Sequence, residues 1–110
     1  MEVIAQLENT PSGGSKILSL AYTDEAGASM IPTGITWSLY DDNGAVVNSR
    51  SAVVVSPAST VSIALIAADC TALVSPTRRR IVVTATYTSV YGVGIPLVYC
   101  GEFFVVPVKT

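Results

Sequence analysis

The chain has 110 residues and a formal net charge of −2, and its one basic cluster is the run Arg78-Arg79-Arg80. Charged residues make up 13% of the sequence and hydrophobic residues 50%, so charge is about half as frequent as in a typical globular protein. This length predicts a single domain over residues 1–110. The slightly acidic balance excludes nucleic acid from the expected partners, and no apolar run approaches the roughly 18 residues of a membrane helix. Met1-Glu2-Val3 lacks the basic and apolar regions of a signal peptide, so we expect a cytoplasmic chain.

The high share of hydrophobic residues indicates that some apolar side chains remain at the surface. A single domain of this size has too little interior to enclose half of its residues. Part of the apolar surface is therefore expected to meet another subunit or a partner protein. Assembly is the class of function that the composition favours.

The first third of the chain predicts two strands. Residues 3–7 form a short apolar strand, and the turn-forming residues 9–15 that follow predict a loop or a bulge. Residues 16–23 alternate, with Leu18, Leu20 and Tyr22 on one face, which is the pattern of a half-buried strand.

The clearest local pattern is a β-hairpin over residues 34–47. Ile35, Trp37 and Leu39 share one face of its first strand, because side chains alternate between the two faces of a sheet. Residues 41–44, Asp-Asp-Asn-Gly, supply the turn, since asparagine and glycine tolerate the positive φ that a tight reversal requires. We expect Trp37 to lie in the core.

The middle of the chain predicts two further strands and one helical turn. Residues 52–55 form a short apolar strand, and residues 60–66 alternate, with apolar side chains inward. The inward residues of the second strand are Val61, Ile63 and Leu65. Residues 67–73 favour a helical turn, which ends at Ser75-Pro76 because a residue before proline avoids the helical region.

The last third of the chain predicts a long hairpin. Residues 80–91 alternate apolar side chains with a row of threonines, which is typical of a strand with one solvent face. Residues 92–94, Gly-Val-Gly, form a flexible tip, and residues 97–108 form a final strand that is apolar on both faces. Short strands with turns at regular spacing predict an all-β fold, a two-sheet antiparallel sandwich of about seven strands.

The residues that carry most enzyme chemistry are missing or badly placed. The chain has no histidine, so a Ser-His-Asp or Cys-His arrangement is impossible and we expect no enzyme and no catalytic residue. Asp41 and Asp42 are adjacent in a turn, so their side chains diverge, whereas a glycosidase holds two carboxyl groups across a cleft. A small enzyme with a deep pocket and two paired acids is the alternative.

Metal and cofactor sites are equally unexpected. Cys70 and Cys100 have no CxxC spacing and no histidine to complete a zinc site, so they are either a disulfide or two buried thiols, and we favour the thiols. Asp24-Glu25 and residues 41–43 would bind Ca²⁺ only if their loops converged, and they lack the ligand spacing of a calcium loop. We expect no metal and no cofactor.

Two sets of residues are candidates for contact with partners. Arg78, Arg79 and Arg80 are able to grip an anion, although such a run is more often a solvated strand entrance that discourages edge-to-edge aggregation. The second set is apolar and lies around the glycine-bearing tip and along the final strand, where one core cannot absorb all of it. Its members are Tyr91, Val93, Ile95, Tyr99, Phe103, Phe104 and Val106.

The order of these elements resembles the immunoglobulin-like sandwich. In that resemblance, Trp37 is the core tryptophan of the third strand, residues 80–91 correspond to strand F and residues 97–108 to strand G. The inter-sheet cysteine pair of antibody domains is absent, because both cysteines fall elsewhere. The inward positions that match it are held by Leu20 or Tyr22 and by Ala85 or Tyr87.

The chain resembles more specifically the small immunoglobulin-like domains of tailed-phage and prophage structural proteins, including the amino-terminal domains of baseplate upper proteins. The segments that carry this resemblance are residues 18–27 (LSLAYTDEAG), 36–44 (TWSLYDDNG) and 81–87 (IVVTATY). The resemblance implies a non-enzymatic structural role in a virion assembled in the host cytoplasm. The implied partners are further copies of the chain, in a homo-oligomer, and other virion components. The alternative is an adhesion or carbohydrate-binding module of a larger exported protein.

Overall fold

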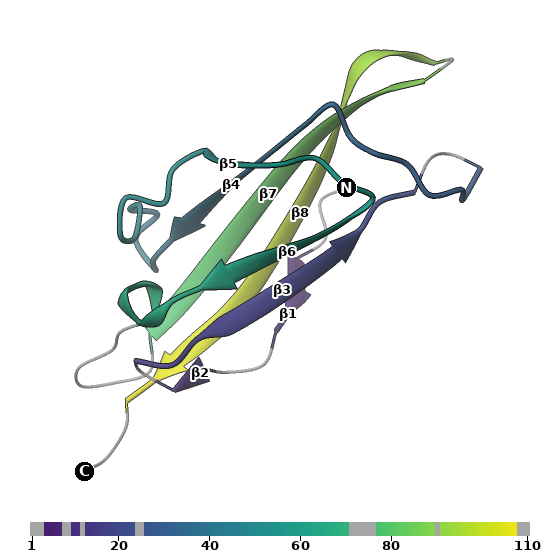
Figure 1. Cartoon of the computed structure of the whole chain (residues 1–110). Helices are drawn as coiled ribbons and strands as arrows, with labels where there is room; N and C mark the ends of the chain where they lie inside the picture. The colour runs from purple at the N-terminus through teal and green to yellow at the C-terminus, as the bar shows by residue number, and fades with distance from the viewer. Residues whose placement is uncertain are drawn as a thin grey trace.

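The computed structural model describes residues 4–7, 10–11, 13–23, 26–70, 77–89 and 91–107, and these residues form an all-β fold (Figure 1). The strands are β1 (Ile4–Gln6), β2 (Thr10–Pro11), β3 (Lys16–Ala21), β4 (Gly34–Tyr40), β5 (Val53–Val55), β6 (Thr60–Leu65), β7 (Thr77–Ser89) and β8 (Gly92–Val106). One 3₁₀ turn, η1 (Ala67–Asp69), follows β6. In this part of the chain, no helix is long and apolar enough to cross a membrane.

The strands form two sheets. The larger sheet has the order β1-β8-β7-β4-β5; it is antiparallel from β8 to β5, and β1 and β2 join β8 in parallel. The smaller sheet is the antiparallel pair β3–β6. Figure 1 shows this pair lying across one face of β7 and β8. The two-sheet, all-β expectation is therefore confirmed.

The core lies between the sheets and follows the predicted alternation. Ile35, Trp37 and Leu39 of β4 are 2%, 5% and 0% exposed, and the inward residues of β6 and β7 are equally buried. Burying one large apolar side chain stabilises a fold by about 1.5–3 kcal/mol. The inward residues of β6 and β7 are Val61, Ile63, Leu65, Ile81, Val83 and Ala85.

The hairpin that begins with β4 departs from the prediction after its turn. Gly44 has φ +79° and closes the turn as expected, but Val46 then forms only a single bridge with Tyr40. Residues 48–52 bulge out, with positive φ at Asn48, Ser49 and Ala52, and β5 pairs with β4 only after this bulge. The predicted second strand is therefore interrupted, because the left-handed conformation at Asn48, Ser49 and Ala52 turns the chain away from regular pairing and leaves isolated hydrogen bonds to β4, such as that from the Leu39 N–H to the Arg50 carbonyl oxygen.

The final hairpin is longer than the sequence indicates. β7 begins at Thr77 rather than residue 80, and β8 begins at Gly92 rather than residue 97, so the predicted glycine tip lies inside β8. The ladder runs from Thr77–Val105 to Ser89–Gly92 and makes the molecule 54 Å long and 23 Å across. The ends predicted at residues 3 and 108, and the end of the helical turn at Ser75-Pro76, lie outside the described residues.

The two cysteines are buried thiols on different sides of the larger sheet. Cys70 is 0% exposed and belongs to the core cluster. Cys100 is 2% exposed and lies on the opposite face of β8 from the core residue Phe103, because neighbouring residues of a strand alternate in direction. Burial raises the pKa of the Cys70 thiol, as does the nearby Asp69 charge. The thiol alternative therefore describes this pair.

Replacing Leu39 with alanine should test the core. We expect Leu39→Ala to lower the free energy of unfolding by about 2–5 kcal/mol, because it removes a fully buried side chain and leaves a cavity. The matched control is Val54→Ala, since Val54 is 80% exposed on the outer face of the same sheet and should change stability by about 0.5 kcal/mol at most. Urea unfolding measures both, and equal effects would contradict the assigned core.

Candidate functional site

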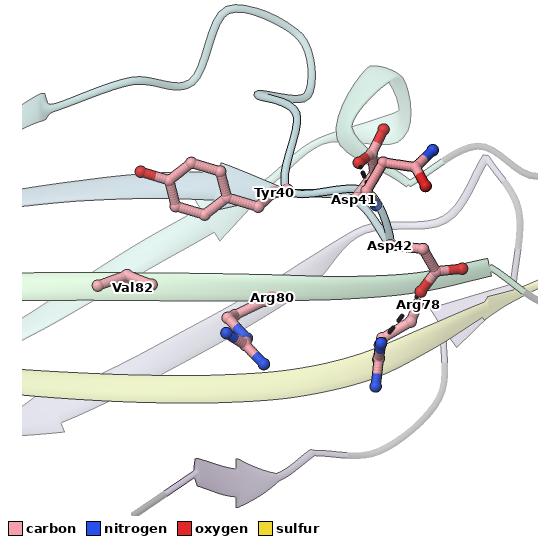
Figure 2. A pocket seen from close by; sticks show the side chains of 8 residues that line it. Tyr40, Asp41, Asp42, Arg78, Arg80 and Val82 are labelled. Atoms are coloured by element: carbon pink, nitrogen blue, oxygen red, sulfur yellow. Dashed lines mark hydrogen bonds and ion pairs between the residues drawn. The ribbon is translucent and has the colours of Figure 1, made fainter. Parts of the chain in front are cut away.

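A cleft of about 450 Å³ lies at one end of the larger sheet, where β4 turns beside β7 (Figure 2). Its floor is built by the predicted turn. The Asp41 carboxylate accepts the backbone N–H groups of Asn43 and Ala45 through one oxygen, at 2.9 and 3.0 Å. Asp41 is thus committed to holding the turn, as its position in the sequence predicts. The residues that line the cleft are Tyr40, Asp41, Asp42, Asn43, Gly44, Arg78, Arg80 and Val82.

The alternation of β7 divides the arginine run between two faces of the sheet. Arg78 and Arg80 lie on the outer face and enter the cleft, whereas Arg79 is 6% exposed and donates to the Asp69 carbonyl oxygen at 3.4 Å. The three guanidinium groups therefore do not form one anion site. Arg79 is part of the interior instead.

Both outer arginines are engaged by carboxylates. Arg78 contacts Asp42 at 3.1 Å, which Figure 2 shows as a dashed line, and Arg80 contacts Glu102 at 2.8 Å. Exposed pairs of this kind contribute about 0–1 kcal/mol each. Among the described residues, no buried side-chain nitrogen or oxygen lacks a hydrogen-bond partner. The cleft therefore resembles a solvated strand entrance more than a site prepared for an anionic ligand.

A buried carboxylate with several hydrogen bonds is Asp69, which sequence reasoning did not identify. It is 0% exposed and accepts hydrogen bonds from Asn48 at 2.9 Å, from Arg50 Nε at 2.9 Å and from the Ile66 N–H at 2.8 Å. Burial alone raises the pKa of Asp69, but these hydrogen bonds and the Arg50 charge outweigh it, so the net pKa lies below the usual range. The charged form is therefore the stable one.

A signal for this pair does exist in the sequence. Asp69 is the one acidic residue between Asp42 and Glu102, and Arg50 is the one basic residue between Lys16 and Arg78. Two opposite charges isolated in apolar surroundings are candidates for a buried pair, because a lone buried charge is too costly. The sequence does not show that the two meet, since that depends on the bulge at residues 48–52.

The apolar contact candidates fall into three places. Tyr91 and Val93 are 77% and 86% exposed at the end of the β7–β8 hairpin, and Ile95 beside them is half-buried. Phe104 is 39% exposed, and together with the half-buried Val106 it lies at the other end of β8. Tyr99 is half-buried against the core, and Phe103 is 0% exposed inside it, so Phe103 is not available to a partner.

Metal-ligating side chains do not gather at any one place in the part of the chain that the structure describes. Among the described residues, no three histidine, cysteine, aspartate or glutamate side chains lie close enough together to hold a metal ion. Asp24 and Glu25, which the calcium alternative needs, lie outside the described residues. Comparisons with protein families, with curated proteins and with solved structures find no match to this chain.

The Asp69 pair predicts a specific dependence of stability on pH. Because the folded-state pKa of Asp69 lies below the unfolded value of about 3.9, its contribution is present above about pH 4 and is lost as the pH falls toward the folded-state pKa. We expect Asp69→Asn to lower the free energy of unfolding at pH 7 by about 2–4 kcal/mol, because Arg50 loses its counter-charge. The variant should also lose less stability than the wild type between about pH 5 and 2.

The matched control is Asp42→Asn, which removes the exposed pair with Arg78 and should change stability by about 1 kcal/mol or less. Denaturant unfolding over this pH range measures all three proteins. Parallel pH curves for the wild type and Asp69→Asn would contradict the assignment.

Proposed function

We propose that the chain is a non-enzymatic, immunoglobulin-like structural protein of a phage or prophage particle, assembled in the host cytoplasm. It acts through apolar contacts with further copies of itself and with other virion components. The proposal rests on the resemblance of residues 18–27, 36–44 and 81–87 to such domains, together with the surface described above. It requires neither a cofactor nor a catalytic group.

The strand order supports the immunoglobulin-like part of the proposal. In that fold the third, sixth and seventh strands form one sheet with the tryptophan on the third, and variable-type domains add a further strand beside it. The order β8-β7-β4-β5, with Trp37 on β4, matches this arrangement. The pair β3–β6 corresponds to the second and fifth strands of the opposite sheet, and that sheet is smaller here than in the family.

The observation that carries the proposed function is the apolar arm, defined as the described residues 87–89 and 91–96 at the end of the β7–β8 hairpin. β4 stops pairing at Gly34–Thr86, so the arm extends beyond the sheet as a two-stranded ribbon (Figure 1). The chain from Ile81 to Gly101 contains no charged residue. An uncharged arm that exposes Tyr91 and Val93 is suited to insertion against a partner, because rigid aromatic and apolar side chains lose little entropy on binding.

A charge on the arm should therefore weaken assembly without unfolding the domain. We expect wild-type protein to form a discrete oligomer by light scattering over a range of concentrations, with and without reductant, and Val93→Asp to shift it to smaller species. Val54→Asp is the matched control, because Val54 is 80% exposed and lies on β5, opposite Thr36 of β4, outside the arm. A wild-type monomer at all concentrations would contradict self-assembly and leave a binding module for another protein.

Phe104 tests the other end of β8. Because its side chain is 39% exposed on the outer face, we expect Phe104→Asp to dissociate an oligomer while the thermal unfolding midpoint stays within a few degrees of the wild type. Circular dichroism and light scattering measure the two effects. Global unfolding would instead place Phe104 in the core.

A further inference from the structure

One side of the sandwich, along β3, is left open. The core-facing residues of β6 are fully buried, whereas Leu18, Leu20 and Tyr22 on and after β3 are only half-buried although they face the same core. On the β6 side, Val55 and Ala58 pack against the core and close it. The two edges of the smaller sheet are therefore covered unequally.

The open side contains an apolar groove of about 270 Å³ between β3 and β8. The Leu7 side chain lies against Gly101 of β8 and packs on the core, so it covers the open side beside Gly101. The groove lies along β8 toward the arm, at the level of Leu97 and Tyr99. None of its lining residues is charged: Leu20, Ala21, Tyr22, Thr23, Val83, Leu97, Val98 and Tyr99.

The backbone of β3 presents hydrogen-bonding groups to this open side. The Tyr22 N–H donates to the Ser59 carbonyl oxygen at 2.8 Å, so the even-numbered residues of β3 point their backbone groups toward β6. Those of Ile17, Ser19 and Ala21 point the other way. No backbone partner for these three residues is found in the part of the chain that the structure describes.

This edge lacks the protection that the neighbouring edge has. On β8, Pro96 lies opposite Thr86 of β7. The Thr86 carbonyl oxygen points away from β8, because it accepts the Thr33 N–H, so the backbone nitrogen of Pro96 points away from β7 toward the free edge of β8. A proline nitrogen carries no hydrogen, so this edge has one donor fewer to offer another strand. β3 has six residues, no proline, no bulge and no charge after Lys16. Strands with these properties readily accept another strand.

We propose that β3 pairs with β3 of a second copy of this chain, antiparallel, about a two-fold axis at Ser19. In this register Ile17, which is 70% exposed, lies opposite Ala21 of the second copy, and Leu18 lies opposite Leu20. The pairing forms about six hydrogen bonds between the copies. It converts two two-stranded sheets into one four-stranded sheet and brings apolar side chains over both grooves.

The charge distribution selects this orientation. Lys16 is the one charged residue of β3, and the two-fold antiparallel pairing places the two Lys16 side chains at opposite ends of the joined strands. A parallel, in-register pairing would place them side by side, where like charges destabilise a sheet. Opposite each Lys16 the antiparallel register places Tyr22 of the other copy. This pairing rests on the proposed self-assembly and names one of its surfaces.

A proline at Ser19 provides the first test in the full chain. Because the Ser19 N–H points to the open edge, Ser19→Pro removes no bond of the β3–β6 ladder but blocks the centre of the proposed pairing. We expect it to raise the dissociation constant of the dimer about 10- to 100-fold, as measured by sedimentation. Ser62→Pro is the matched control, since Ser62 faces Ser19 across the ladder and its N–H points to the other edge.

A cysteine at Ser19 provides a second test that does not depend on loss of binding. In the proposed dimer the two residues at position 19 form a hydrogen-bonded pair with Cα atoms about 5.5 Å apart, within the range for a disulfide. Ser19→Cys should therefore give a covalent dimer under mild oxidation, whereas Ser62→Cys should not. The native Cys70 and Cys100 are buried and give no background in the wild type.

The outcomes separate this pairing from the wider assembly proposal. Cross-linking at position 19 together with dissociation by Ser19→Pro supports the β3 pairing. An oligomeric wild type that Ser19→Pro leaves intact, with no cross-link at position 19, overturns the pairing while self-assembly stands. A monomeric wild type at every concentration, with no cross-link, overturns both, and an extended segment of another protein then becomes the occupant to seek.

Discussion

The ion pair between Arg50 and Asp69 joins the irregular segment at residues 48–52 to η1, beside the core. Asp69 lies in η1, which follows β6 of the smaller sheet. Arg50 lies in the bulge between β4 and β5 of the larger sheet. Arg50 also lies over the Trp37 ring, 5.5 Å from its centre. Asn48, Ser49 and Ala52 have positive φ, a conformation that residues other than glycine rarely adopt. Tertiary contacts such as these are therefore needed to hold the bulge in place.

The buried face of each long strand could be predicted from sequence because alternation is a local property. Ile35, Trp37 and Leu39 needed only the period of two to be assigned correctly. The interrupted hairpin and the reach of β7 and β8 were missed because they depend on pairing between distant segments. A stretch with several threonines or glycines is compatible with a loop and with a strand, and only the position of a partner strand decides between them.

The candidate site was predictable to the same limited extent. Arg79 could have been separated from Arg78 and Arg80, since consecutive residues of a strand cannot share a face. The same rule separates the buried Phe103 from the exposed Phe104. The alternation of side chains along a strand does not show which of two apolar faces is covered by the opposite sheet. That depends on how many strands the opposite sheet has, and within the described ranges the opposite sheet has two.

A two-stranded sheet is a weak half of a sandwich. An isolated pair of strands is at best marginally stable in water, so β3–β6 depends on the contacts of Val61, Ile63 and Leu65 with the larger sheet. Any strand added to β3 would complete both its hydrogen bonds and the cover of its half-buried leucines. Because binding to the folded state stabilises that state, a strand bound along β3 would raise the free energy of unfolding. Because the smaller sheet has an open edge, apolar side chains such as Leu18 and Leu20 stay half-buried, and this is one place where the apolar, charge-poor composition of the chain reaches the surface.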